Sequence, residues 1–113
     1  MSVDKELLKG STATLVLSVL SRSPMHGYQM VKELESLSKG VLTFKEGTLY
    51  PALHTMEREG LVEARWETDG GRERKVYHLT EHGQDELRRR VAEWEKFRRA
   101  VDGVIAGGAC AYA

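Results

Sequence analysis

The sequence predicts a mostly α-helical α+β fold: a winged helix-turn-helix domain followed by one C-terminal dimerisation helix. Apolar residues recur at helical spacing in four segments, and two short β-type runs flank a glycine turn between the third and fourth. The fourth segment continues past this hairpin with a repeat close to the heptad. We therefore expect a winged domain over residues 1–79, a helix over 80–108 and a flexible tail over 109–113.

The first two helices are expected to form a tri-helical core together with the third. The first runs from about Lys5 to Ser21, and its apolar residues are too many for one stripe, so it should be covered on more than one side. Its apolar run 14–20 is too short to span a bilayer, which predicts a buried helix and no membrane partner. The second helix begins near Gly27 and is closed by Gly40. Its apolar residues at i, i+4 and i+7 are Met30, Leu34 and Leu37.

The third helix is expected to begin with Thr48 as its N-cap and to end before Gly60. Thr48 as N-cap would place Pro51 at the third helical position, where its missing N–H has no intrahelical partner. Its buried stripe is Leu49, Leu53 and Met56.

The opposite face of this helix carries short or hydrogen-bonding side chains, of the kind that can approach base edges in a major groove. They are Thr48, Pro51, Ala52, His54, Thr55 and Arg58. The hydroxyls of Thr48 and Tyr50 lie at the N-terminal end, where a phosphate is attracted. An ordinary solvated helix face is the alternative, and the helix taken alone favours it.

The runs 61–66 and 74–79 are rich in apolar, β-branched and aromatic residues, and Asp69-Gly70-Gly71 lies between them as a turn signal. They predict a hairpin. At its tip Arg72, Arg74 and Lys75 can reach phosphates. The alternative is that these cations are solubilising charges on an exposed strand.

With these motifs the chain resembles the PadR family of transcriptional regulators, in its small subfamily with a single C-terminal helix. The matching segments span about residues 5 to 100. They are Leu7-Leu8-Lys9-Gly10, His26-Gly27-Tyr28, Gly47-Thr48-Leu49-Tyr50-Pro51-Ala52-Leu53, Glu59-Gly60-Leu61-Val62 and the run from Gly71 to Thr80. The resemblance implies a DNA-binding regulator, adds Tyr28 to the expected DNA contacts, and implies a small aromatic or lipophilic effector near a dimer interface.

The last helix is expected to follow Thr80 as N-cap and to dimerise. Its apolar stripe is Leu87, Val91, Trp94, Phe97, Val101 and Val104. An inverted-repeat operator needs two recognition helices about 34 Å apart, which favours a homodimer over the alternative that the stripe folds back onto the first helix. Trp94 and Phe97 are the aromatic residues placed to stack on an effector, although Trp94 as a core residue is the more common use. Gly107-Gly108 is expected to end the helix.

Composition agrees with a small cytoplasmic regulator. Seventeen basic and seventeen acidic residues give a formal net charge of zero, so DNA affinity must come from a localised patch. The single cysteine, Cys110, fits a reducing compartment, and the polar start 1–6 carries no signal peptide.

No catalytic constellation is recognisable, so we expect neither an enzyme nor a cofactor or metal. We expect a sequence-specific regulator, a ligand-responsive repressor acting as a homodimer on double-stranded operator DNA. The alternative function is a winged-helix interaction or dimerisation module that binds no operator.

Overall fold

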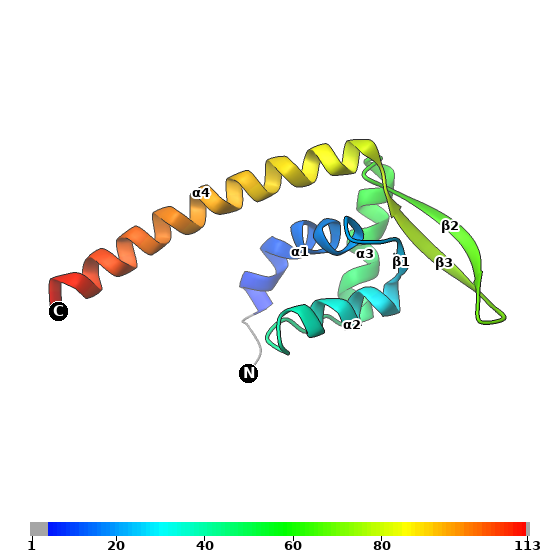
Figure 1. The fold of residues 1–113 in the computed structure, drawn as a ribbon, viewed down its shortest axis with the longest axis horizontal. Helices are drawn as coiled ribbons and strands as arrows, with labels where there is room; N and C mark the ends of the chain where they lie inside the picture. Colours follow the sequence, from blue (N-terminus) through cyan, green and yellow to red (C-terminus); the bar gives the residue numbers. More distant parts are fainter. Residues whose placement is uncertain (1–4, 113) are drawn as a thin grey trace.

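The computed structural model describes residues 5–112, with side chains from 10 to 68 and from 70 to 107. The elements in order are α1 (Lys5–Leu20), β1 (Met25–His26), α2 (Gly27–Leu37), α3 (Glu46–Arg58), β2 (Val62–Asp69), β3 (Arg72–Leu79) and α4 (Glu81–Tyr112). Figure 1 shows α1, α2 and α3 grouped beside the base of the β2–β3 hairpin, while α4 runs over α1 and projects away from the domain. The predicted α+β class and winged-helix architecture are confirmed.

The core lies between the first three helices and the base of the hairpin. Helix α1 packs against α2, α3, β3 and α4, so it is covered on more than one side, as predicted. The most deeply buried side chains are Val16, Leu17, Val19, Met30, Leu49, Leu53, Met56 and Tyr77. The predicted stripes of α2 and α3 both enter this core, except that Leu37 at the end of α2 is exposed.

Helix α3 begins earlier than predicted. The carbonyl of Lys45 accepts hydrogen bonds from the N–H groups of Thr48 and Leu49, at 2.9 and 3.0 Å, so helical bonding starts before Thr48. Lys45 is the N-cap, and Pro51 lies inside the helix. The prediction of Thr48 as N-cap was therefore wrong. Glu46 favours the earlier start through the helix dipole, and the buried stripe holds the helix despite the one backbone donor that Pro51 lacks.

The end of α3 follows the prediction. Gly60 has φ of +74°, and the N–H of Leu61 donates to the carbonyl of Met56 at 2.9 Å. A left-handed residue with this hydrogen bond closes a helix and redirects the chain. The turn delivers the chain from α3 directly into β2.

The hairpin is longer than predicted, and it belongs to a three-stranded antiparallel sheet of order β1-β3-β2. Pairing extends to Asp69 opposite Arg72, which leaves Gly70 and Gly71 as a two-residue turn with φ of +59° and +83°. The short strand β1 pairs with β3 and was not predicted. Two residues are too few for a strand period to appear in a sequence, so only the tertiary pairing reveals β1.

Helix α4 starts as predicted but ends later. The N–H of Gly83 donates to Thr80 Oγ1 at 2.9 Å, which confirms Thr80 as the cap. The helix continues through Gly107-Gly108 to Tyr112, so the predicted helix end and loose tail were wrong as far as residue 112. Glycine lowers helix propensity without ending a helix, and alanines, the best helix formers, surround this pair. Ala113, the last residue of the predicted tail, lies outside the described residues. Over the described residues, no helix is both long and apolar enough to cross a membrane.

Candidate nucleic-acid interface

Helices α2 and α3 form the helix-turn-helix unit, and Gly27 of α2 packs closely against Tyr50 of α3. A Cβ atom at position 27 would lie 2.6 Å from Oη of Tyr50 and 2.8 Å from its Cζ. Tyr50 is partly buried and packs against the core, so its ring fills the space beside α2. Burial, together with the charge of Glu46, raises the pKa of the Tyr50 hydroxyl, which therefore stays protonated at neutral pH. The structure gives Tyr50 a packing role, and its predicted DNA contact stays a prediction.

The outward face of α3 is exposed as predicted. The exposed side chains are those of Thr48, Pro51, His54, Thr55 and Arg58, while Ala52 packs partly against the core. Thr55 Oγ1 donates to the carbonyl of Pro51 at 3.1 Å and lies 3.4 Å from Nη2 of Arg58. These two contacts of Thr55 order the side chains on the C-terminal half of the exposed face of α3. None of these exposed side chains is large and hydrophobic, and most can form hydrogen bonds, a composition that suits approach to base edges in a major groove.

The N-terminus of α2 presents an aromatic and cationic cluster next to α3. His26 is the N-cap, and its Nδ1 accepts from the N–H of Gln29 at 3.2 Å. The His26 ring stacks on Tyr28, with centroids 6.4 Å apart and planes at 9°. Lys32 Nζ lies 4.6 Å from the Tyr28 ring centroid. Tyr28 is 49% exposed, so it is not a buried core residue, and its DNA contact stays a prediction.

The cations of the wing lie along β3. Arg72 is exposed next to the turn, whereas Arg74 and Lys75 are partly buried. Lys75 Nζ lies 3.9 Å from Oε1 of Glu57 on α3 and 5.7 Å from the Tyr77 ring centroid. Lys75 thus bridges the β2–β3 hairpin, which is the wing of the domain, and α3, the second helix of the helix-turn-helix unit and its recognition helix. A pair of this length and exposure is weak, so the ammonium remains available to a phosphate.

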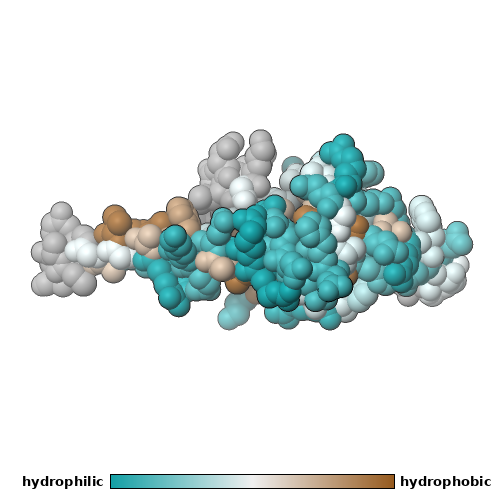
Figure 2. Space-filling view, turned by 90° about the horizontal axis from the view of Figure 1, so that it is seen from above, coloured by the Kyte–Doolittle hydropathy of each residue, from teal (hydrophilic) through white to brown (hydrophobic). Residues whose placement is uncertain are grey.

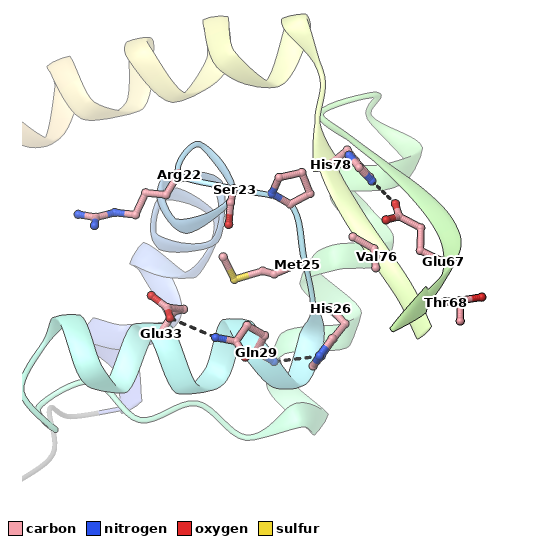
Figure 3. Close-up of a pocket in the computed structure, with 11 residues that line it drawn as sticks. Arg22, Ser23, Met25, His26, Gln29, Glu33, Glu67, Thr68, Val76 and His78 are labelled. Carbon is pink, nitrogen blue, oxygen red and sulfur yellow. Dashed lines mark hydrogen bonds and ion pairs between the residues drawn. The ribbon is translucent and has the colours of Figure 1, made fainter. Parts of the chain in front are cut away.

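The face of the hairpin turned away from α3 borders a hollow of about 650 Å³ beside β1 and the start of α2 (Figure 3). Nε2 of His78 lies 2.6 Å from Oε2 of Glu67, and this contact links β3 to β2 at one wall of the hollow. His26 and Gln29 line the opposite wall. Among the described side chains, no group of three or more His, Cys, Asp or Glu is placed to hold a metal ion.

A compact junction ties α4 to the end of α3. Thr80 Oγ1 donates to the carbonyl of Gly60 at 2.6 Å and lies 3.0 Å from that of Leu61. The backbone N–H of Thr80 also donates to Leu61, at 3.1 Å. Gly83 packs directly on the Leu61 carbonyl, where a Cβ atom would collide. The first turn of α4 is therefore fixed relative to the recognition helix, and sequence reasoning found the cap but not the role of Gly83.

The predicted stripe of α4 divides into two parts. Leu87 packs against the core of its own chain, and Val101 is partly exposed. The other predicted members, Val91, Trp94, Phe97 and Val104, are exposed, and so is Ile105, which the prediction omitted. Figure 2 shows the hydrophobic side chains along the distal part of α4.

A groove of about 800 Å³ lies between α1 and α4. Its apolar wall includes Leu15, Val91, Trp94 and Phe97. The rings of Trp94 and Phe97 lie 6.2 Å apart at 37°, so the two predicted effector residues share one surface. Arg89, Arg90 and Glu93 also line the groove and give it a charged margin.

The charges of α4 pair along the helix. Glu86 accepts hydrogen bonds from Arg89 and Arg90, at 2.8 Å each. The pKa of Glu86 is lowered to about 2, and the hydrogen bond from Arg89 contributes most to this shift. Arg98 pairs likewise with Glu95 and Asp102. Arg89, Arg90 and Arg98 are therefore paired with acidic side chains of the same helix.

Comparison with known proteins agrees with this geometry. The model of the transcriptional regulator PadR-like family matches residues 16–89. The chain is similar to the transcriptional regulator YqjI of Escherichia coli, with 31% identity over 100 residues that cover 88% of this chain and 47% of YqjI. It therefore spans about half the length of that relative. It is also similar to the transcriptional regulator Rv3488 of Mycobacterium tuberculosis, with 29% identity over 88% of this chain and 90% of Rv3488.

Solved structures show the same architecture. A PadR family transcriptional regulator from Eggerthella lenta is 34% identical, with a TM-score of 0.77 over 88% of this chain and 86% of that one. A PadR family regulator from Clostridium difficile is 28% identical, with a TM-score of 0.75 over 85% of this chain and 99% of that one. The chain belongs to the PadR-like family of transcriptional regulators, which are DNA-binding regulatory proteins and not enzymes.

Proposed function

We propose that this chain is a ligand-responsive repressor that binds an inverted-repeat operator as a homodimer in the cytoplasm. The observation that carries the proposal is the apolar surface of α4, on a helix that projects from the domain. Trp94 is 48% exposed, Phe97 62% and Val104 77%. Side chains of this kind seldom form a contiguous exposed patch on a monomer.

The energetics favour a second copy as the partner of this surface. Burial of one such side chain is worth roughly 1.5–3 kcal/mol, so several from each subunit can offset the entropy lost on association. A two-fold axis would then present two α3 helices to one face of the DNA. The DNA contacts we assign are Tyr28, Thr48, Tyr50, Pro51, His54, Thr55, Arg58, Arg72, Arg74 and Lys75.

The groove between α1 and α4 supports effector binding by a small aromatic or lipophilic compound. Trp94 and Phe97 offer an apolar, aromatic surface, and a groove of about 800 Å³ is of the size that such ligands occupy. The Thr80 junction fixes α4 to the end of α3. A ligand that changes the angle between the α4 helices of the two subunits would therefore also change the separation of the two recognition helices.

The test is a footprint of the purified protein on the DNA upstream of its own gene, together with sedimentation at micromolar concentration. We expect a dimer, protection of two half-sites and affinity that falls steeply with salt. Planar aromatic compounds should quench Trp94 fluorescence and release the DNA. A dimer that protects no DNA would favour the interaction-module alternative, and a monomer that protects two half-sites would overturn the dimer.

A further inference from the structure

Trp66 is a large aromatic side chain that the core does not use. It lies on β2, in the outer half of the hairpin, and is 69% exposed. Strand alternation places Trp66 on the same face as Val62, which is buried, and Ala64, which packs against the core. This face therefore turns toward the helices, and Trp66 continues it just beyond the edge of the core.

The cross-strand partner of Trp66 places it beside the recognition helix. Trp66 is opposite Lys75 on β3, and Lys75 Nζ reaches to 3.9 Å from Glu57 on α3. Directly opposite residues of an antiparallel pair have neighbouring side chains on one face. Trp66 thus lies on the side of the wing that faces α3, next to a cation assigned to DNA.

Dimerisation through the exposed stripe of α4 would not bury Trp66. Figure 1 shows the hairpin and the free end of α4 projecting in opposite directions from the helical domain. A surface on α4 that pairs two subunits would leave the outer hairpin uncovered. A tryptophan exposed to this extent is instead typical of a contact surface for a ligand with both apolar and hydrogen-bonding groups.

We propose that Trp66 packs on the sugar–phosphate backbone of bound DNA, between the groove that receives α3 and the groove that receives the wing. The inference rests on the proposed operator binding. The duplex backbone offers apolar deoxyribose surfaces beside phosphate oxygens, and the indole offers an apolar ring with a single N–H donor. Trp66 contributes to affinity without reading sequence, and as a neutral group it releases no counterion.

This neutrality gives the contact a signature that distinguishes it from the cationic residues beside it. Removal of a lysine that neutralises one phosphate lowers the slope of log affinity against log salt by about 0.9. Removal of an indole should weaken binding by the same factor at every salt concentration. Trp66→Ala and Lys75→Ala are therefore a matched pair on adjacent positions of one hairpin face.

The experiment measures binding of wild type, Trp66→Ala, Trp66→Phe and Lys75→Ala to the footprinted duplex and to an unrelated duplex, from low to high salt. For Trp66→Ala we expect about tenfold weaker binding to both duplexes with the wild-type salt slope, as for a truncated interface aromatic. Trp66→Phe should recover part of this loss. The chain has two tryptophans, so only Trp94 can report in Trp66→Phe, and the emission change that DNA causes should be smaller than in wild type.

The outcomes separate the two proposals. A wild type that binds neither duplex defeats the proposed operator binding itself. Wild-type binding that Trp66→Ala retains in full overturns the contact alone, and a loss confined to the footprinted duplex replaces the backbone contact by base readout. A change in sedimentation of Trp66→Ala, with DNA binding intact, would assign the residue to a protein contact instead. Unchanged thermal unfolding of the variant is the control for folding.

Discussion

Gly27 and Tyr50 pack so closely that a Cβ atom at position 27 would lie 2.6 Å from the Tyr50 hydroxyl oxygen and 2.9 Å from its Cε1. The absence of a side chain on Gly27 thus leaves room for the Tyr50 ring between the two helices of the helix-turn-helix unit. A functional surface on α3 depends in this way on a residue of α2 that is itself buried.

Gly27→Ala should destabilise the domain by about 1–3 kcal/mol, because the added methyl overfills this contact. Chemical unfolding at fixed protein concentration measures the change. Tyr50→Leu should relieve part of the cost in the double variant, since the two positions are in contact. Gly47→Ala is the matched control, because a Cβ there meets no heavy atom within 4 Å. Equal stability of the Gly27 and Gly47 variants would contradict the packing argument.

Gly83→Ala should cost about 3 kcal/mol, near the upper end for overpacking, because the new methyl meets the backbone carbonyl of Leu61 rather than a movable side chain. Thr80→Ala should cost about 1 kcal/mol as the loss of a helix cap. Thermal unfolding measures both changes. Gly103→Ala, on the same helix with open space around it, should be neutral or slightly stabilising. A Gly83→Ala variant as stable as wild type would show that α4 can move away from the end of α3 without loss of stability.

Val101→Asp should yield monomers, because it places a charge within the apolar stripe that we assign to the dimer. Operator affinity should then fall by at least tenfold, since each recognition helix would bind alone. Lys96→Asp is the control on the opposite side of α4, where Lys96 is exposed. It places an aspartate on the same helix, with an even larger change in net charge, and should leave the dimer intact. Sedimentation equilibrium distinguishes the variants, and a dimeric Val101→Asp would refute the assigned interface.

Glu86 should give the fold a measurable acid dependence. Hydrogen bonds from Arg89 and Arg90 lower its folded pKa from an ordinary 4.5 to about 2. A depressed carboxyl pKa stabilises the folded state above pH 4.5, and this contribution is lost as pH falls toward 2. Glu86→Gln should therefore be less stable than wild type at pH 7, with the difference shrinking below pH 4.5. A constant stability difference between Glu86→Gln and wild type from pH 7 to pH 2 would show that the pairing of Glu86 contributes nothing to the free energy of unfolding.

Elements with local signals could be predicted from the order of the amino acids alone. Several local features lie where the sequence pattern predicted them. They are the buried residues Met30 and Leu34 of α2, the buried stripe Leu49, Leu53 and Met56 of α3, the helix end at Gly60, the turn at Gly70-Gly71 and the helix cap at Thr80. Helical periodicity and left-handed glycines are properties of a few consecutive residues, so no tertiary information is needed to find them. The outward face of α3 follows directly from its buried stripe.

The three-dimensional packing revealed the features that depend on residues far apart in the chain. It paired β1 with β3, turned Tyr50 toward Gly27, and set Gly83 on the Leu61 carbonyl. It also separated Leu87, which packs on its own core, from the exposed remainder of the α4 stripe, and it left Trp66 uncovered on the wing. Periodicity identifies which side of an element is apolar, but what covers that side depends on the three-dimensional packing of segments far apart in the chain.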